Sequence, residues 1–160
     1  MLILVQLEID GWKANIKFSS AHLLPGHKRC GVLHGHTYSI STRIYGEVND
    51  QGFLVDFTLL KSHLREIAAK LDHRILIPEK NKLFTVSNKE IIINENEKKY
   101  VFPKEDCILL PITSVTAENL ADYILLELIQ NMDLPKNIKK IEIGVDEGFG
   151  QEAWVSKVVG

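Results

Sequence analysis

A two-residue alternation of apolar and polar side chains marks the beginning of the chain. Residues 2–9 are mostly apolar and residues 12–20 alternate, with the turn signal Asp10-Gly11 between them. Because side chains on a strand point to opposite faces in turn, this pattern predicts two β segments around a turn. A long strand is expected over about residues 34–48, with its alternate positions on one face.

Two later segments show the spacing of three and four residues that is typical of an amphipathic helix. The first begins after Asp56, a helix-capping residue, and ends near Leu71, from which a loop is expected to reach Pro78. The second begins after Thr116, the predicted N-cap, and ends before Pro135.

Residues 78–107 form an insertion between the two predicted helices. Within it, residues 83–102 alternate weakly and are rich in Asn, Glu and Lys, so one or two exposed hairpins are expected. A short strand is expected at 108–110, and strands over 138–145 and 153–159 complete the chain.

This order predicts an α+β fold: an antiparallel sheet with two helices on one face, in a ββααββ-like order with the insertion between the helices. A length of 160 residues and a hydrophobic content of 45% fit one domain over residues 1–160 with its own core. The net charge of −2 predicts no general binding to nucleic acid or to anionic membranes. Two cysteines in different contexts suggest no disulfide framework, and the apolar start lacks a basic leader, so a cytoplasmic protein is expected.

The densest chemistry lies between Ser20 and His36. His34 and His36 are two residues apart, so on a strand both imidazoles leave the same face. With His22 from a neighbouring segment they could bind Zn²⁺ and leave its fourth position open, as in a catalytic zinc site. His-x-His alone fits equally well with two histidines that only form hydrogen bonds, but the third histidine and the nearby Cys30 favour a metal.

Three further positions carry candidate chemistry. Cys30 could be a fourth zinc ligand, an inert thiol or a thiolate that moves protons, and the sequence alone does not choose among these. Asp72-His73 follows a helix, where the Asp could orient the imidazole for proton transfer or the pair could simply end the helix. Glu147 lies in a Gly-rich turn, where its carboxylate could bind an amidine-like edge or be only a turn residue.

Together these motifs resemble those of the 6-pyruvoyltetrahydropterin synthase and 6-carboxytetrahydropterin synthase family. They occur in the family's order over most of the chain, and their combination is highly specific although each alone is weak. The matching motifs are Phe18-Ser19-Ser20-Ala21-His22, Cys30-x-x-x-His34-Gly35-His36, Val55-Asp56-Phe57-x-x-Leu60-Lys61, Leu71-Asp72-His73, Thr116-Ala117-Glu118-Asn119-Leu120-Ala121 and Val145-Asp146-Glu147.

The resemblance implies a tunnelling fold (T-fold), in which antiparallel sheets from several subunits join into a barrel around a pore. It implies a homo-oligomer, a hexamer built as a dimer of trimers, with active sites between subunits. The implied substrate is 7,8-dihydroneopterin triphosphate. The pyruvoyl branch retains the three-carbon side chain, whereas the carboxy branch releases acetaldehyde and triphosphate and feeds 7-deazaguanine synthesis, hence queuosine or archaeosine.

The resemblance also implies roles for the candidate residues. The thiol would exchange protons with the substrate side chain, and the Asp-oriented imidazole would be its proton-transfer partner. The glutamate would anchor the amino-pyrimidine edge of the pterin, and the capping threonine would lie close to that ring. The implied zinc ligands are His22, His34 and His36, the implied catalytic residues are Cys30, Asp72, His73 and Glu147, and the implied pterin-binding residues are Glu147 and Thr116.

The spacing within the motif from Cys30 to His36 separates the two branches of the family. Three residues between Cys30 and His34 resemble the carboxy branch, because pyruvoyl-type members have a wider gap. The expected function is therefore that of a zinc-dependent 6-carboxytetrahydropterin synthase. The alternatives are a 6-pyruvoyltetrahydropterin synthase or another pterin lyase or aldolase on the same scaffold, and a non-catalytic zinc-bound module that binds a pterin or a protein.

Overall fold

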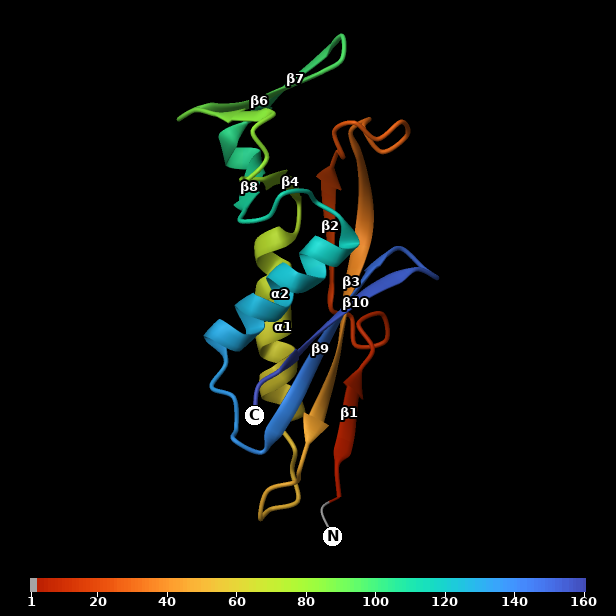
Figure 1. Cartoon of the computed structure of the whole chain (residues 1–160), viewed down its shortest axis with the longest axis vertical. Helices are drawn as coiled ribbons and strands as arrows, with labels where there is room; N and C mark the ends of the chain where they lie inside the picture. The colour runs from red at the N-terminus through yellow and green to blue at the C-terminus, as the bar shows by residue number, and fades with distance from the viewer. Residues whose placement is uncertain (1–2) are drawn as a thin grey trace.

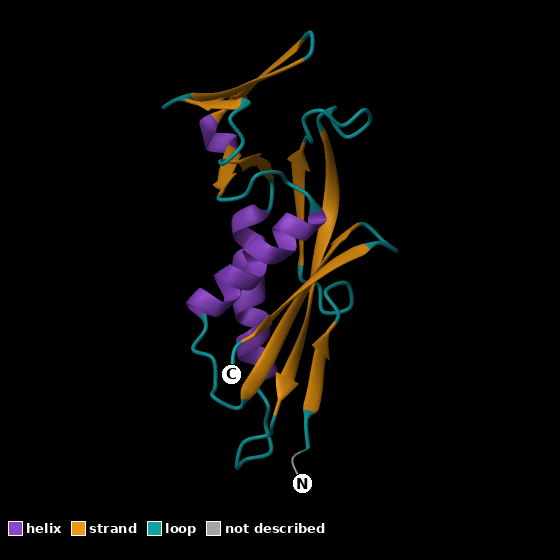
Figure 2. Ribbon diagram, viewed as in Figure 1, coloured by secondary structure: helices purple, strands orange, loops and turns teal. Residues whose placement is uncertain are grey.

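Two helices lie on one side of a twisted sheet, and a smaller sheet projects from one end of the molecule (Figure 1). The computed structural model describes residues 3–160. Figure 2 shows that strands and helices are separated into layers, so the α+β class predicted from the sequence is confirmed. The main sheet has the strand order β10-β9-β3-β2-β4-β8, with β1 also paired to β3.

The long strand β3 (His34–Gly46) is the axis of the main sheet. On one side it pairs antiparallel with β9 (Ile138–Glu147). On the other side β1 (Val5–Ile9) and β2 (Lys17–His22) follow one another along it, and both are antiparallel to it. The alternate positions of β3 share one face as predicted, and four of them are buried; they are Tyr38, Ile40, Thr42 and Ile44.

The two segments predicted around Asp10-Gly11 both contain strands, but β1 and β2 pair with β3 and not with each other. Residues 12–15 form turns instead of the start of a strand. Gly11 lies against the backbone of Ile40, where an added Cβ would be 2.3 Å from the carbonyl oxygen. A turn packed this closely requires glycine, and it shifts the chain outward between the two strands. Residue 2, predicted to begin the first strand, lies outside the described residues.

Residues after the first helix were predicted to form a loop, but Arg74–Pro78 is strand β4. It pairs parallel with β2 and with β8 (Cys107–Leu110). The sheet is therefore antiparallel except at this edge. The opposite edge is β10 (Glu152–Val158), which is antiparallel to β9.

The helices α1 (Phe57–Leu71) and α2 (Ala117–Asn131) begin where the capping residues predict. The carboxylate of Asp56 accepts a hydrogen bond from Thr58 N at 2.7 Å, and the hydroxyl of Thr116 accepts one from Asn119 N at 3.3 Å. Within residues 3–160, neither helix has the length and apolar content needed to span a bilayer. The buried side chains of the helices join one core with the main sheet; they include Leu60, Leu64, Leu71, Leu120, Ile124 and Leu128.

The insertion contains a separate three-stranded antiparallel sheet of β5 (Phe84–Val86), β6 (Glu90–Glu95) and β7 (Lys98–Pro103). A 3₁₀ turn over Lys104–Asp106 leads from it to β8. The predicted hairpins are confirmed, but one face of this sheet is covered rather than exposed. Its buried residues form a second apolar cluster together with Leu23, which follows β2, and Ile77 of β4; those from the inserted sheet are Phe84, Ile91, Ile93 and Phe102.

Candidate metal and substrate site

Strand pairing brings the three predicted zinc ligands together. His22 at the end of β2 is directly opposite His34 at the start of β3, and His36 follows on the same face. One ring nitrogen from each histidine lies within 4.8 Å of the others. The Nε2 atoms of His22 and His34 are 3.1 Å apart.

Backbone carbonyls fix the orientation of two of these rings. The Nδ1 of His22 donates to the carbonyl of Val115 at 2.8 Å, and the Nδ1 of His34 donates to that of Val32 at 2.6 Å. In neutral rings with protonated Nδ1 atoms, both Nε2 atoms present lone pairs, which repel at close range unless a cation lies between them. The Nε2 of His36 is buried without a hydrogen-bond partner. Three such nitrogens, two oriented by outer hydrogen bonds, fit a metal ion that keeps an open position.

The protonation state of His22 agrees with this role. Burial, with a smaller contribution from the neighbouring imidazoles His34 and His36, lowers the pKa of His22 to about 4 although its hydrogen bond to Val115 acts in the opposite direction. A ring with this pKa is neutral near pH 7, which is the form that binds a metal.

A cavity of about 400 Å³ adjoins the three histidines. Cys30 lines this cavity and is a free thiol, but it is not a member of the group of possible metal ligands. Glu147 lines it as well, with Oε2 4.0 Å from Nε2 of His36. The cavity therefore combines three histidines that could hold a metal ion, a thiol and a carboxylate.

A second cavity of about 300 Å³ adjoins the first, and the two share the lining residues Leu24, Glu147 and Gln151. Thr116 lines this second cavity at the start of α2. Thr116 and Glu147 therefore line the same cavity. Gln151 was not singled out from the sequence, because its place beside Glu147 arises only when β9 and β10 pair.

The Asp72-His73 pair forms as predicted but lies elsewhere. Asp72 Oδ2 accepts a hydrogen bond from Nδ1 of His73 at 2.8 Å, and Asp72 Oδ1 accepts one from Ser19 N at 2.7 Å. The bond from Ser19, followed by that from His73, lowers the pKa of the Asp72 carboxyl. His73 has a positive φ of 55°, an uncommon backbone conformation that keeps the ring at the end of α1.

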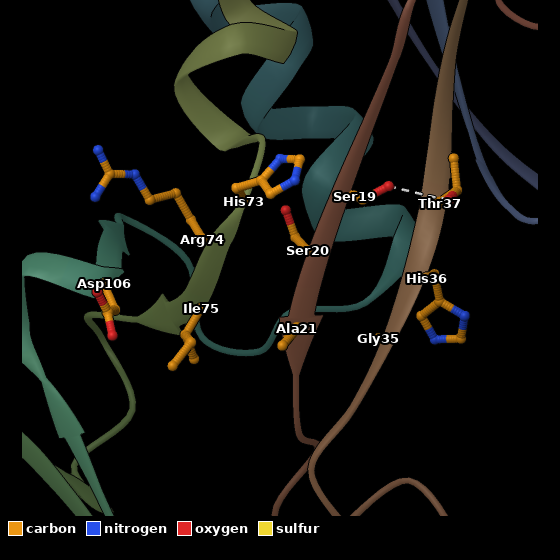
Figure 3. Close-up of a pocket in the computed structure, with 10 residues that line it drawn as sticks. All are labelled: Ser19, Ser20, Ala21, Gly35, His36, Thr37, His73, Arg74, Ile75 and Asp106. Atoms are coloured by element: carbon orange, nitrogen blue, oxygen red, sulfur yellow. Dashed lines mark hydrogen bonds between the residues drawn. The ribbon is translucent and has the colours of Figure 1, made fainter.

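The His73 ring is 85% exposed and borders an open depression of about 590 Å³. Figure 3 shows it on the β4 side of β2, whereas the ring of His36 projects from β3 away from it. Among the residues that the structure describes, His73 does not line the cavity that contains Cys30. One chain therefore assembles the three histidines, the thiol and the carboxylate in one cavity, and presents the Asp72-His73 pair outward.

Comparison with known proteins agrees with this geometry. The sequence profile described as 6-pyruvoyl tetrahydropterin synthase matches residues 12–157. The chain belongs to the 6-pyruvoyl tetrahydropterin synthase family. Members of this family have lyase-type enzyme activity, so the chain is an enzyme of that type.

Sequence relatives carry the name of the carboxy branch. A Methanocaldococcus jannaschii protein, provisionally named 6-carboxy-5,6,7,8-tetrahydropterin synthase, is 39% identical over 96% of this chain and 97% of its own length. A Bacillus subtilis protein named 6-carboxy-5,6,7,8-tetrahydropterin synthase is 29% identical over 69% of this chain and 62% of its own length.

Solved structures named as pyruvoyl synthases share the whole fold. The Plasmodium vivax 6-pyruvoyltetrahydropterin synthase superimposes with a TM-score of 0.90 at 29% identity, over 98% of this chain and 99% of that one. The Plasmodium falciparum enzyme gives 0.89 at 32% identity, with the same coverage. The T-fold is thus confirmed. The inserted strands β5 to β7 also have a counterpart there, because they are much longer than the 2% of the chain left uncovered.

Proposed function

We propose that this chain is a zinc-dependent 6-carboxy-5,6,7,8-tetrahydropterin synthase that converts 7,8-dihydroneopterin triphosphate and releases acetaldehyde and triphosphate. The observation that carries the proposal is the single cavity in which His22, His34 and His36 stand beside Cys30 and Glu147. The names of the sequence relatives support the carboxy branch over the pyruvoyl branch. Such a product would supply 7-deazaguanine (queuosine or archaeosine) synthesis in the cytoplasm.

The three histidines would hold zinc through ring nitrogens. When bound, zinc supplies Lewis acidity, which makes the C–H and O–H groups of a nearby hydroxylated side chain more acidic. Cys30 lies in the same cavity and would accept and return protons there. Glu147 would bind the amino-pyrimidine edge through two parallel hydrogen bonds, with Thr116 close to the ring in the adjoining cavity.

The proton-transfer partner of Cys30 would come from another copy of the chain. His73 is exposed and carries a hydrogen-bonded Asp72, but both lie outside the cavity of their own chain. In a homo-oligomer, a hexamer built as a dimer of trimers, the pair of one subunit would reach the cavity of the next. This arrangement explains why an oriented imidazole is displayed at the surface.

The two branches differ by one molecule of water. Loss of triphosphate, with transfer of hydrogen from the side chain to the C=N bond of the dihydropterin ring, leaves a tetrahydropterin whose side chain has two adjacent carbonyl carbons, which is the pyruvoyl product. Addition of water with cleavage of the bond between these carbons gives a carboxylate on the ring and acetaldehyde. Carbon, oxygen and hydrogen balance, and no oxidant is needed. A carboxy enzyme must therefore admit water to the cavity after elimination.

Turnover by matched variants tests the proposal. Zinc-loaded wild-type protein and the Cys30→Ala variant are incubated with 7,8-dihydroneopterin triphosphate, and loss of substrate, bound metal and bound pterin are measured. The proposal predicts turnover by the wild type and loss of turnover in Cys30→Ala with metal and pterin binding intact. Metal and pterin binding without turnover by either protein would instead support a non-catalytic binding module.

A further inference from the structure

The loop that carries Cys30 joins β2 to β3 and lies at the same end of the molecule as the inserted β6–β7 hairpin (Figure 1). Both ends of this loop are anchored in the apolar cluster of the inserted sheet. Leu23, at the start of the loop, is 3% exposed and belongs to the cluster, and Leu33, at its end, packs against it. The loop is thus attached to the insertion on each side of the thiol.

A polar contact attaches the middle of the loop as well. The backbone N–H of Gly26 donates to Oε1 of Glu95, at the end of β6, at 2.7 Å. Gly26 has a φ of 82°, which side chains with a Cβ rarely adopt, so the loop turns sharply where the carboxylate binds it. Loop and hairpin also face one another across a small cavity of about 250 Å³ that residues from both of them line.

From Gly26, hydrogen bonds within the loop lead to the thiol-bearing residue. His27, the next residue, accepts a hydrogen bond from Cys30 N through its Nδ1 at 3.0 Å. Leu24 N donates to the carbonyl of Cys30 at 2.7 Å. The backbone of Cys30 is therefore held on both of its polar groups by residues that flank the contact with Glu95.

We propose that the inserted sheet positions the Cys30 loop and that Glu95 is the positioning residue. A carboxylate accepts a stronger hydrogen bond than a neutral group does, and Glu95 stands on a paired strand with a buried face. It orders the thiol without lining the cavity that contains the thiol. The expected effect on turnover rests on the proposed function, which assigns proton transfer to Cys30. The expected effect on the order of the loop is independent of that function.

The test compares Glu95→Ala and Glu95→Gln with Glu97→Ala, which removes an exposed carboxylate from the same hairpin turn. Amide hydrogen exchange of residues 24–31, bound metal, kcat and KM are measured on each zinc-loaded protein. Glu95→Ala removes one charge-assisted hydrogen bond. We therefore expect amide exchange in the loop to rise and kcat to fall, each by about tenfold. Metal content and KM stay unchanged. In Glu95→Gln, whose amide oxygen can still accept a hydrogen bond from Gly26 N, loop exchange and kcat return most of the way to their wild-type values. Glu97→Ala behaves as wild type.

Unchanged loop exchange in Glu95→Ala would overturn the proposal, as would an equal change in Glu97→Ala. A fall in stability with normal loop exchange and normal kcat would show that Glu95 serves only the hairpin, and would also overturn it. Failure of the proposed function is visible separately. In that case Cys30→Ala retains turnover, or wild type shows none, while the exchange measurement still reports whether Glu95 orders the loop.

Discussion

At the residue scale, the site depends on two imidazoles whose lone pairs face one another. His22 and His34 each give their Nδ1 proton to a carbonyl, and their Nε2 atoms meet at 3.1 Å. Such an arrangement is unfavourable without a cation and favourable with one. The metal is thus expected to contribute to the stability of this end of the sheet as well as to chemistry.

Removal of one ligand tests this expectation. His36→Ala should lower metal affinity by more than about 100-fold, because loss of even an outer hydrogen bond to a metal ligand costs 10–100-fold. Metal content after dialysis should fall from about one ion per chain to nearly none. His63→Ala, on α1 outside the ligand group, is the control and should retain its metal. Equal metal content in both variants would contradict the assignment.

Acid should remove a stabilising contribution of Asp72. Its pKa is lowered in the folded chain, first by the hydrogen bond from Ser19. A depressed folded-state pKa means that the contribution is complete above the unfolded pKa and is lost as pH falls through the folded value. Urea midpoints of wild type and Asp72→Asn, each freed of metal, should therefore differ at pH 7 and converge below about pH 4. A gap that widens on acidification would contradict this account.

The candidate residues could be identified from the sequence because spacing on a strand decides which side chains share a face. That His34 and His36 share a face follows from the two-residue period of a strand alone. The approach of His22 depends in addition on the pairing of its strand with theirs. The separation of His73 from the Cys30 cavity could not be predicted from local pattern. It follows from the path of α1, which places His73 on the other side of β2.

At the element scale, the helices follow local signals and the edge of the sheet does not. Both N-caps lie where their side-chain oxygens predict, because capping is a contact within three residues. β4 was predicted as a loop because a short apolar run has no period of its own. Its pairing with β2 and β8 joins segments that are distant along the chain. Residues 12–15 were misassigned because a tight turn, anchored by buried Ile16, can imitate alternation.

The contribution of the α1 N-cap to the stability of the protein can be measured with one substitution. Asp56→Ala removes the acceptor for Thr58 N and should lower the free energy of unfolding by about 1 kcal/mol. Asp50→Ala, in the exposed turn before the helix, is the control and should change it by less than about 0.5 kcal/mol. Urea unfolding at a single protein concentration gives the free energies of unfolding of wild type, Asp56→Ala and Asp50→Ala. Equal stabilities would show that the cap contributes nothing.

At the scale of the whole molecule, a single chain contains only part of the proposed active site. The three histidines and Cys30 lie in one cavity, while the oriented imidazole of His73 is exposed outside it. Fold and family follow from the comparisons, which cover nearly the full chain. Assembly of several chains would complete the proposed site.

Mixing two inactive variants tests assembly. Cys30→Ala and His73→Ala should each lose turnover. Refolded together in equal amounts, they should recover about a quarter of wild-type turnover, since random mixing gives that share of sites an intact thiol and an intact imidazole from different subunits. The Cys30→Ala,His73→Ala double variant mixed with wild type is the control for subunit exchange. No recovery in a mixed oligomer would place both groups in one chain.

The ratio of acetaldehyde to triphosphate released distinguishes the proposed carboxy branch from the pyruvoyl branch. Zinc-loaded protein is incubated with 7,8-dihydroneopterin triphosphate, and both products are quantified together with the mass of the pterin. One acetaldehyde per triphosphate, with a carboxylated tetrahydropterin, is the predicted result. Triphosphate without acetaldehyde, with the three-carbon side chain retained on the pterin, would contradict the proposal and assign the chain to the pyruvoyl branch.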